Sequence, residues 1–236
     1  GLIASSADGL LWPPKTHVRN VSWPPPQKWD THQNVFFDDT SQTYVVTTRS
    51  VPEEPTGLER ETSLTRSTGP SYDFDFTKAP PVIVRGNLSH QTYAQVTFPW
   101  LNVYLGLVMV YDQGPVPAKP WPEGLVHCRL TYASKPEGPW QPVEGANVIE
   151  APDFLPLGGP KAFDSHVIFA AARPFRQGAG AAATEQIYYM GGNGPHSGPR
   201  NSSFALATLR PDGWASVHGQ GSFTTPSLTV TGAMLT

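Results

Sequence analysis

The stretch Cys128-Arg-Leu-Thr-Tyr-Ala-Ser-Lys-Pro-Glu-Gly-Pro-Trp140 decides the fold: an alternating strand runs into a small polar residue, a glycine turn and an aromatic residue. Related phrases occur at residues 2–12 (LIASSADGLLW), 63–72 (SLTRSTGPSY, a degraded copy) and 204–214 (FALATLRPDGW). Neighbouring copies lie roughly 60 to 75 residues apart. Self-similarity at a regular period indicates a repeat architecture in which each phrase belongs to one structural unit.

Each phrase predicts a β-hairpin. Asp8-Gly9 and Asp212-Gly213 follow alternating residues. This dipeptide favours a tight turn because glycine adopts positive φ without steric cost. We expect the aromatic residue at the end of each phrase to cover the next strand.

Two further strand candidates precede each later hairpin, and they are rich in β-branched and aromatic residues. They are Gln33–Asp38 with Thr43–Arg49, Tyr93–Phe98 with Tyr104–Tyr111, and Asp164–Phe169 with Gln186–Met190. Four strands per repeat, with a period of two and no helical stripe, predict an all-β fold. A β-propeller of four-stranded blades fits this long period better than a β-sandwich.

The repeats divide the chain into a propeller portion and a short tail. Residues 1–221 are expected to form the outer hairpin of one blade plus three blades. Because a propeller closes to hide its strand edges, we expect a partial ring that the rest of its own chain, or a partner, completes. Residues 222–236 are a closing strand or the start of a following β-sandwich module, and the change of composition there favours the module.

Composition and charge exclude two classes of partner. The 236 residues include 26 Pro and 22 Gly with 15% charged residues, which is typical of a turn-rich, all-β chain. A net charge of -3 with scattered Lys and Arg leaves no basic face for nucleic acid. The longest apolar run, Tyr104–Tyr111, is far shorter than the roughly 20 residues of a membrane span.

Three glycosylation sequons favour the secretory pathway and an extracellular or cell-surface location. They begin at Asn20, Asn87 and Asn201. Cys128, the single cysteine, is expected to be a small residue packed on a strand rather than a reactive thiol. The sequons predict a secreted glycoprotein, whereas a single cysteine neither proves nor excludes an oxidising compartment.

The segment 29–46 (WDTHQNVFFDDTSQTYVV) resembles the blade opening of five-bladed propellers related to glycoside hydrolase family 32. The blocks 156–165, 186–196 and 206–213 are similar to uncharacterised family-32-like proteins. The resemblance covers about residues 2–217. It implies a five-bladed ring in the full protein, and in those relatives a β-sandwich module follows the propeller.

The resemblance also implies three acidic residues on the inner strands of successive blades, converging in a central funnel. Asp30 matches the transition-state-stabilising Asp, although Trp29 and Thr31 stand where the family has Arg and Pro. The acid/base Glu expected at the head of the next blade is not found, and Gln95 or a neighbour occupies its place. The nucleophile would belong to an earlier blade.

Other polar residues are candidates for catalysis or sugar contact. Asp164 heads an apolar strand, which aims it at the funnel unless it caps a turn. Next to Asp30, polar side chains occur where a buried strand prefers apolar ones, and the loop 191–198 (GGNGPHSG) forms a strand exit at the funnel rim or a plain glycine turn. The predicted sugar contacts are His32, Gln33, Asn34, Gln95, Asn193 and His196.

The histidines are too dispersed for metal-ligand spacing, so neither a metal nor another cofactor is expected. The first functional hypothesis is a glycoside-hydrolase-like propeller that acts on or binds carbohydrate, with Asp30 and Asp164 as its acidic pair. The alternative is a non-catalytic carbohydrate-binding or structural extracellular glycoprotein. The missing Glu and the Pro-rich loops 23–26 and 115–122 favour that alternative.

Overall fold

A computed structural model describes residues 2–4, 6–8, 10–12, 17–20, 29–51, 60–75, 80–114, 124–216, 219–222 and 224. The Pro-rich loops 23–26 and 115–122, and most of the tail 222–236, lie outside this part of the chain. The strands are β1 Leu2–Ala4, β2 His17–Asn20, β3 Trp29–Asp38, β4 Thr43–Ser50, β5 Glu61–Arg66, β6 Val82–Val84, β7 His90–Trp100, β8 Val103–Asp112, β9 Leu125–Ala133, β10 Gln141–Pro142, β11 Val167–Ala170, β12 Phe175–Gln177, β13 Thr184–Gly192 and β14 Ser202–Leu209. A 3-10 turn at Gly180–Ala182 joins β12 to β13, and the predicted all-β fold class is confirmed.

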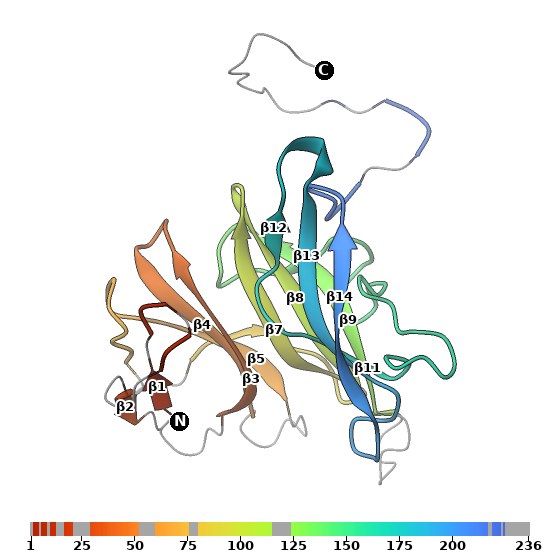
Figure 1. The fold of residues 1–236 in the computed structure, drawn as a ribbon, viewed down its shortest axis with the longest axis horizontal. Coiled ribbons are helices and arrows are strands. Elements are labelled where there is room, and N and C mark those ends of the chain that lie inside the picture. Colours follow the sequence, from red (N-terminus) through yellow and green to blue (C-terminus); the bar gives the residue numbers. More distant parts are fainter. Residues whose placement is uncertain are drawn as a thin grey trace.

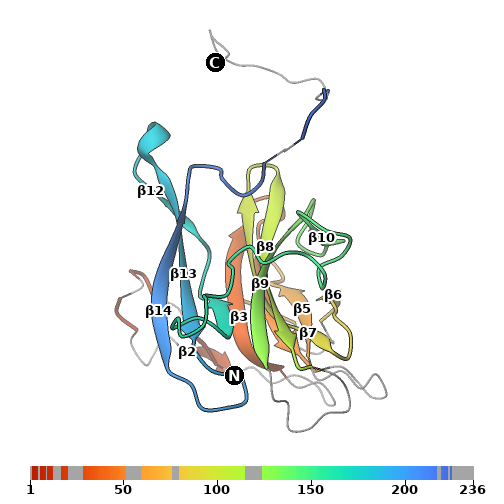
Figure 2. The same ribbon diagram turned by 90° about the vertical axis from the view of Figure 1, so that its right-hand side faces the viewer.

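The strands form successive antiparallel meanders, and a short parallel pairing of β11 with β9 joins the second and third meanders in one eight-stranded sheet (Figures 1 and 2). The first meander is β3-β4-β5-β6, and the second is β7-β8-β9-β10. In the third, β11 and β12 both pair with β13, which pairs with β14. The short strands β1 and β2 pair with each other. Meanders that follow one another and pack face to face are the construction of a propeller.

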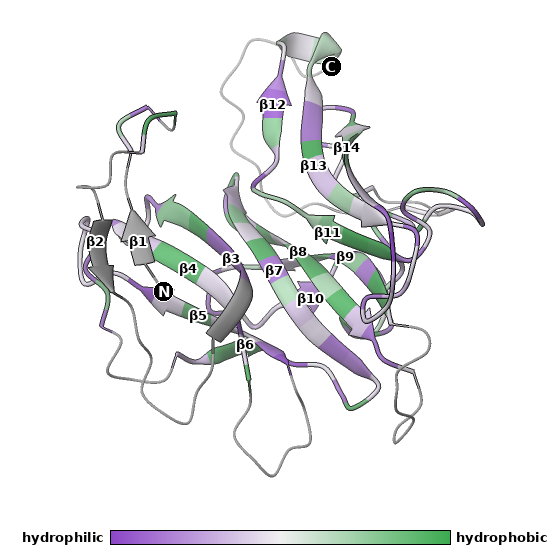
Figure 3. Cartoon of the chain, turned by 60° about the horizontal axis from the view of Figure 1, so that its bottom comes forward, coloured by the Kyte–Doolittle hydropathy of each residue, from purple (hydrophilic) through white to green (hydrophobic). Residues whose placement is uncertain are grey.

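Apolar side chains fill both interfaces between the meanders. Phe36 and Leu64 of the first meander pack with Val108 and Trp140 of the second. Between the second and third meanders lies another cluster, which includes Leu107, Cys128, Ile168 and Ile187. Figure 3 shows hydrophobic residues along β11 and along the strands beside it. Each fully buried Leu or Ile contributes about 1.5–3 kcal/mol to stability.

Strand β8 explains why residues 104–111 form an unbroken apolar run. Tyr104, Val108 and Val110 contribute to the cluster shared with the first meander. The alternating Leu107 and Met109 contribute to the cluster shared with the third. Because successive side chains of a strand point to opposite faces, a strand covered on both sides is apolar at every position. The run is therefore a central strand, buried between two layers.

The hairpin predictions hold for one phrase and fail for another. The phrase 128–140 contains the end of β9 and the turn after it, and the pairing strand β10 follows directly at Gln141–Pro142. Residues 204–209 form β14, but no strand that pairs with it follows in the described residues. Trp214 instead packs against Phe98 and Trp100, with ring centroids 5.4 Å away in both cases. The aromatic residue thus seals the interface with the second meander.

The strand expected at Asp164–Phe169 begins later than predicted, at Val167. Asp164 lies in the turn before β11. Among the described residues, no helix has the length and apolar character needed to cross a membrane.

Candidate functional site

A cavity of about 570 Å³ lies where all three meanders contribute side chains. We call it the Tyr93 cavity. It is lined by His32 and Gln33 of β3, Tyr93 of β7, Phe169 and Ala170 of β11, Ala171, Met190 of β13, Phe204 of β14, and His196 and Arg200 of the loop between β13 and β14. Three of the predicted sugar contacts, His32, Gln33 and His196, therefore meet in one hollow.

Interruptions of regular strand pairing occur at this cavity. The pairing of β3 with β4 is irregular between Asp30 and Asn34, the segment that contains His32 and Gln33. The pairing of β7 with β8 is irregular between Thr92 and Ala94, so that Tyr93 is an extra residue. A bulge re-aims a side chain, and bulges are frequent next to functional sites. Both irregular segments therefore contain residues whose side chains line the cavity.

An aromatic and cationic environment surrounds the imidazole of His196. Its Nε2 atom lies 3.2 Å from the hydroxyl oxygen of Tyr93. The ring centroids of Tyr93 and Tyr111 lie 5.0 and 5.1 Å from that of His196. Arg49 stacks over the ring of Tyr93, with Cζ 4.6 Å from its centroid, and Arg60 over the ring of Tyr111 at the same distance. Such cation–π contacts stabilise a charge next to apolar groups.

This environment keeps the imidazole neutral. Burial, followed by the guanidinium groups of Arg60, Arg200 and Arg49, lowers the pKa of His196 to about 4. Burial also lowers the pKa of His32, outweighing the opposite effect of its 3.3 Å hydrogen bond to the carbonyl oxygen of Ala171. Neutral imidazoles can both donate and accept hydrogen bonds, as sugar hydroxyls require.

The two predicted acids are placed differently. Asp30 belongs to β3 and its backbone is the register partner of Arg49, but its side chain lies outside the described residues. The Asp164 carboxylate accepts a 2.9 Å hydrogen bond from the hydroxyl of Tyr189. Tyr189 and the cavity-lining Met190 are neighbours on β13 and project to opposite faces. Asp164 therefore does not line the Tyr93 cavity.

Three other predicted contacts also lie away from the cavity. The Asn34 side-chain oxygen accepts a 2.9 Å hydrogen bond from the Thr97 backbone, which joins the first two meanders. The buried Gln95 amide donates to Thr97 Oγ1 at 2.9 Å. Exposed Asn193 accepts a 2.9 Å hydrogen bond from the backbone nitrogen of Asn201. Asn34 and Asn193 thus accept hydrogen bonds from the backbone, and Gln95 donates one to a side-chain hydroxyl of its own strand.

The structure describes the side chains of two of the three predicted glycosylation sites. Asn87 and Asn201 are exposed. The Asn87 side-chain oxygen accepts hydrogen bonds from the backbone nitrogens of Ser89 and His90, at 3.0 and 2.8 Å. Asn20 ends β2, and its side chain lies outside the described residues. Glycosylation of all three stays a prediction.

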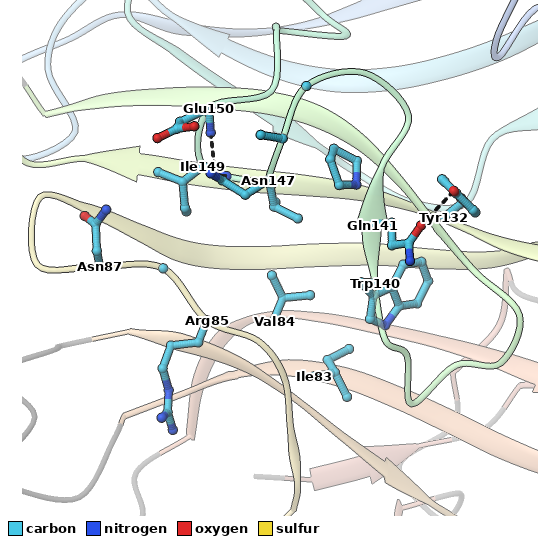
Figure 4. A pocket seen from close by; sticks show the side chains of 15 residues that line it. Ile83, Val84, Arg85, Asn87, Tyr132, Trp140, Gln141, Asn147, Ile149 and Glu150 are labelled. Carbon is cyan, nitrogen blue, oxygen red and sulfur yellow. Dashed lines mark hydrogen bonds between the residues drawn. The ribbon is translucent and has the colours of Figure 1, made fainter.

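A second hollow, of about 800 Å³, lies between the outer strands β6 and β10 (Figure 4). Its polar groups largely satisfy one another. The Tyr132 hydroxyl donates to Gln141 Oε1 at 2.8 Å, and Asn147 Oδ1 accepts hydrogen bonds from the backbone nitrogens of Ile149 and Glu150 at 2.9 and 3.0 Å. Of the predicted site residues only Asn87, a sequon residue, lines it. The Tyr93 cavity is therefore the stronger candidate site.

The sequence did not single out several residues of the Tyr93 cavity. Tyr93 could be seen only as the first residue of an expected strand, because a bulge leaves no clear pattern in one sequence. Arg200 follows the glycine-rich loop 191–198, and its hydrogen bonds to the carbonyl oxygens of Pro195 and His196 hold it at the cavity. Within the described part of the chain, no group of three or more His, Cys, Asp and Glu is placed to hold a metal ion.

Comparisons with known proteins gave structural neighbours only. No protein-family model matches the sequence, and no similar curated protein was found. A solved glycoside hydrolase has 12% identity and a TM-score of 0.48, over 79% of this chain and 47% of that one. An N-acetylgalactosamine deacetylase from F. plautii has 11% identity and a TM-score of 0.48, over 75% and 49%. An alpha-L-arabinofuranosidase from Podospora anserina has 16% identity and a TM-score of 0.45, over 79% and 55%. The chain spans about half the length of these proteins.

Proposed function

We propose that the protein binds carbohydrate in the Tyr93 cavity. One observation carries the proposal: His32, Gln33 and His196, predicted from the sequence as sugar contacts, line the same hollow. They share it with the aromatic rings of Tyr93, Phe169 and Phe204. A ligand site typically combines apolar and aromatic surface with a few convergent polar groups. Aromatic faces suit the C–H faces of a sugar ring, and the polar groups suit its hydroxyls.

Glycoside hydrolysis is a second candidate, favoured by the place of Asp30. Glycosidases usually require two carboxyl groups, about 5–5.5 Å apart in retaining enzymes and 6.5–9.5 Å apart in inverting ones. Asp30 precedes the cavity-lining His32 by two residues on β3. Asp164, in contrast, is held by Tyr189 away from the cavity. Binding is therefore our first proposal, and catalysis requires Asp30 and a further acid.

The finer architecture is also a proposal: a five-bladed ring related to glycoside hydrolase family 32, closed by a further blade. The face of the third meander that points away from the second supports it. There Phe175, Tyr188 and Leu206 are exposed. Tyr188 and Leu206 are register partners, and Phe175 stacks on Tyr188. An apolar sheet face of this kind typically packs on another layer.

An extracellular location is proposed on the three sequons. The exposure of Asn87 and Asn201 supports it, because glycan attachment needs an accessible asparagine. Treating the secreted protein with an N-glycosidase tests this location. We expect its apparent mass to fall, and a protein without glycan would contradict the proposal.

Isothermal titration with a panel of fructan, arabinan and pectic oligosaccharides tests binding. Gln33→Ala and His32→Ala remove polar groups of the cavity, and we expect at least tenfold weaker binding in each. Gln141→Ala is the matched control, because Gln141 lines the second hollow. Unchanged binding in both cavity variants would contradict the proposal, as would a wild type that binds no sugar.

Catalysis is tested separately by release of reducing sugar from the same panel. If the protein is active, Asp30→Asn abolishes turnover while sugar binding persists. Asp164→Asn retains turnover because the Asp164 side chain does not reach the cavity. Turnover that survives Asp30→Asn would contradict the role of Asp30.

A further inference from the structure

The wall of the Tyr93 cavity includes a positively charged side chain. Arg200 lines it directly. Arg49 and Arg60 stack on Tyr93 and Tyr111, the two rings that contact His196. Among the described side chains that line the cavity, none is acidic. The Arg200 guanidinium at the cavity wall creates a local positive potential that favours an anion over a neutral ligand.

Arg200 differs from other arginines of the fold. Arg66, Arg85 and Arg176 each form an ion pair with a carboxylate at 2.5–2.8 Å. Within the described part of the chain Arg200 has no such pair, and its Nη1 donates to the carbonyl oxygens of Pro195 and His196. These bonds hold the guanidinium at the cavity wall without neutralising its charge.

The same loop leaves further nitrogen atoms without a hydrogen bond. Arg200 Nε and His196 Nδ1 are buried and have no hydrogen-bond partner among the described residues. A buried polar group without a hydrogen-bond partner is energetically unfavourable, and a ligand that supplies the partner relieves that cost. Where Arg200 and His196 lie, the cavity wall therefore contains nitrogen atoms that lack hydrogen-bond partners among the described residues.

We propose that the Tyr93 cavity takes a sugar that carries a carboxylate, a uronic acid residue of an acidic oligosaccharide, with the carboxylate on Arg200. This inference rests on the proposed carbohydrate-binding function and names its ligand class. Arginine presents a planar fork of donors that matches a carboxylate, and charge-assisted hydrogen bonds of this type are strong. The exposed ring of Phe204 offers a face to the sugar.

The test compares trigalacturonate with the neutral trisaccharide obtained by reducing its carboxyl groups, both titrated calorimetrically. We expect the wild type to prefer the acidic sugar by about ten- to a hundredfold, the range given by a hydrogen bond to a charged group. Arg200→Gln removes this preference, so that the ratio of the two affinities falls to about one. Arg210→Gln makes the same change of charge at an exposed position outside the cavity and keeps the preference.

The outcomes separate this inference from the proposed function. Equal affinity for the acidic and the neutral sugar overturns the inference and leaves the carbohydrate-binding function standing. Binding of neither sugar overturns both. An Arg200-dependent preference for a sulfated sugar over trigalacturonate overturns the carboxylate assignment. If Arg200→Gln does not fold, Arg200→Lys replaces it, because lysine keeps the positive charge but lacks the planar fork of donors. We expect Arg200→Lys to prefer the acidic sugar several-fold less strongly than the wild type does. An unchanged preference for the acidic sugar would contradict the inference.

Discussion

Acidification should weaken the fold through His196. The pKa of His196 is about 4 in the folded protein, against an ordinary value of 6.5, because burial and three arginines disfavour the imidazolium. As the pH falls from about 6.5 to 4, the unfolded chain takes up a proton at this histidine and the folded protein does not. Stability therefore falls across this window and is not lowered further by this group below pH 4.

The structure sets the size of the effect. A gap from 6.5 to about 4, at about 1.36 kcal/mol per pKa unit, gives an upper limit of about 3 kcal/mol. Because the imidazole is only partly buried, solvent screening reduces this to about 1–2 kcal/mol. His32, whose pKa burial also lowers, adds a contribution of the same sign.

Urea unfolding at pH 7, 6, 5 and 4.5 measures this effect. We expect the wild type to lose about 1–2 kcal/mol more between pH 7 and 4.5 than His196→Gln, which lacks the titrating group. Gln141→Ala removes a polar side chain that does not titrate and lies away from the cavity, and it should keep the slope of the wild type. Identical pH dependence in the wild type and His196→Gln would refute the cationic environment of this imidazole.

Three further predictions concern packing and reactivity. Gly191→Ala should lower the free energy of unfolding in urea by about 1–3 kcal/mol, because the added Cβ would lie 2.5 Å from Cβ of Asp164. Gly159→Ala is the control: a Cβ added there has no neighbouring atom within 4 Å, so stability should not fall. Tyr189→Phe should cost about 1.5–3 kcal/mol in the same assay by removing the hydrogen bond to Asp164, and an unchanged midpoint would contradict that bond's role. The Cys128 thiol should resist iodoacetamide until urea unfolds the protein, because burial raises its pKa; rapid alkylation of the native protein would contradict its place in the core.

Much of the fold could be predicted from local pattern. The run 104–111 is apolar at every position because β8 is covered on both faces, and the expected strand lies within Val103–Asp112. The phrase 128–140 gave its hairpin because a glycine turn follows an alternating strand. The turn at 211–214 did not produce a second strand, because Trp214 packs into the cluster between the second and third meanders. Tertiary packing decided that outcome.

The candidate site was harder to predict. His32, Gln33 and His196 could be proposed because polar side chains stood at strand heads or in a glycine-rich loop. Asn34 and Gln95 have the same polar character, yet they hydrogen-bond neighbouring β7 groups inside the sheets. The difference depends on bulges that change which face a side chain takes, and a single sequence does not reveal them.

The most direct test of sugar binding in the Tyr93 cavity is NMR of the imidazole groups during titration with trigalacturonate. The seven histidines give separate signals that can be assigned by substitution. We expect the signals of His32 and His196 to shift together with one dissociation constant, while those of His90 and His127, which do not line the cavity, stay in place. Binding that leaves the His32 and His196 signals unmoved would contradict this assignment of the site.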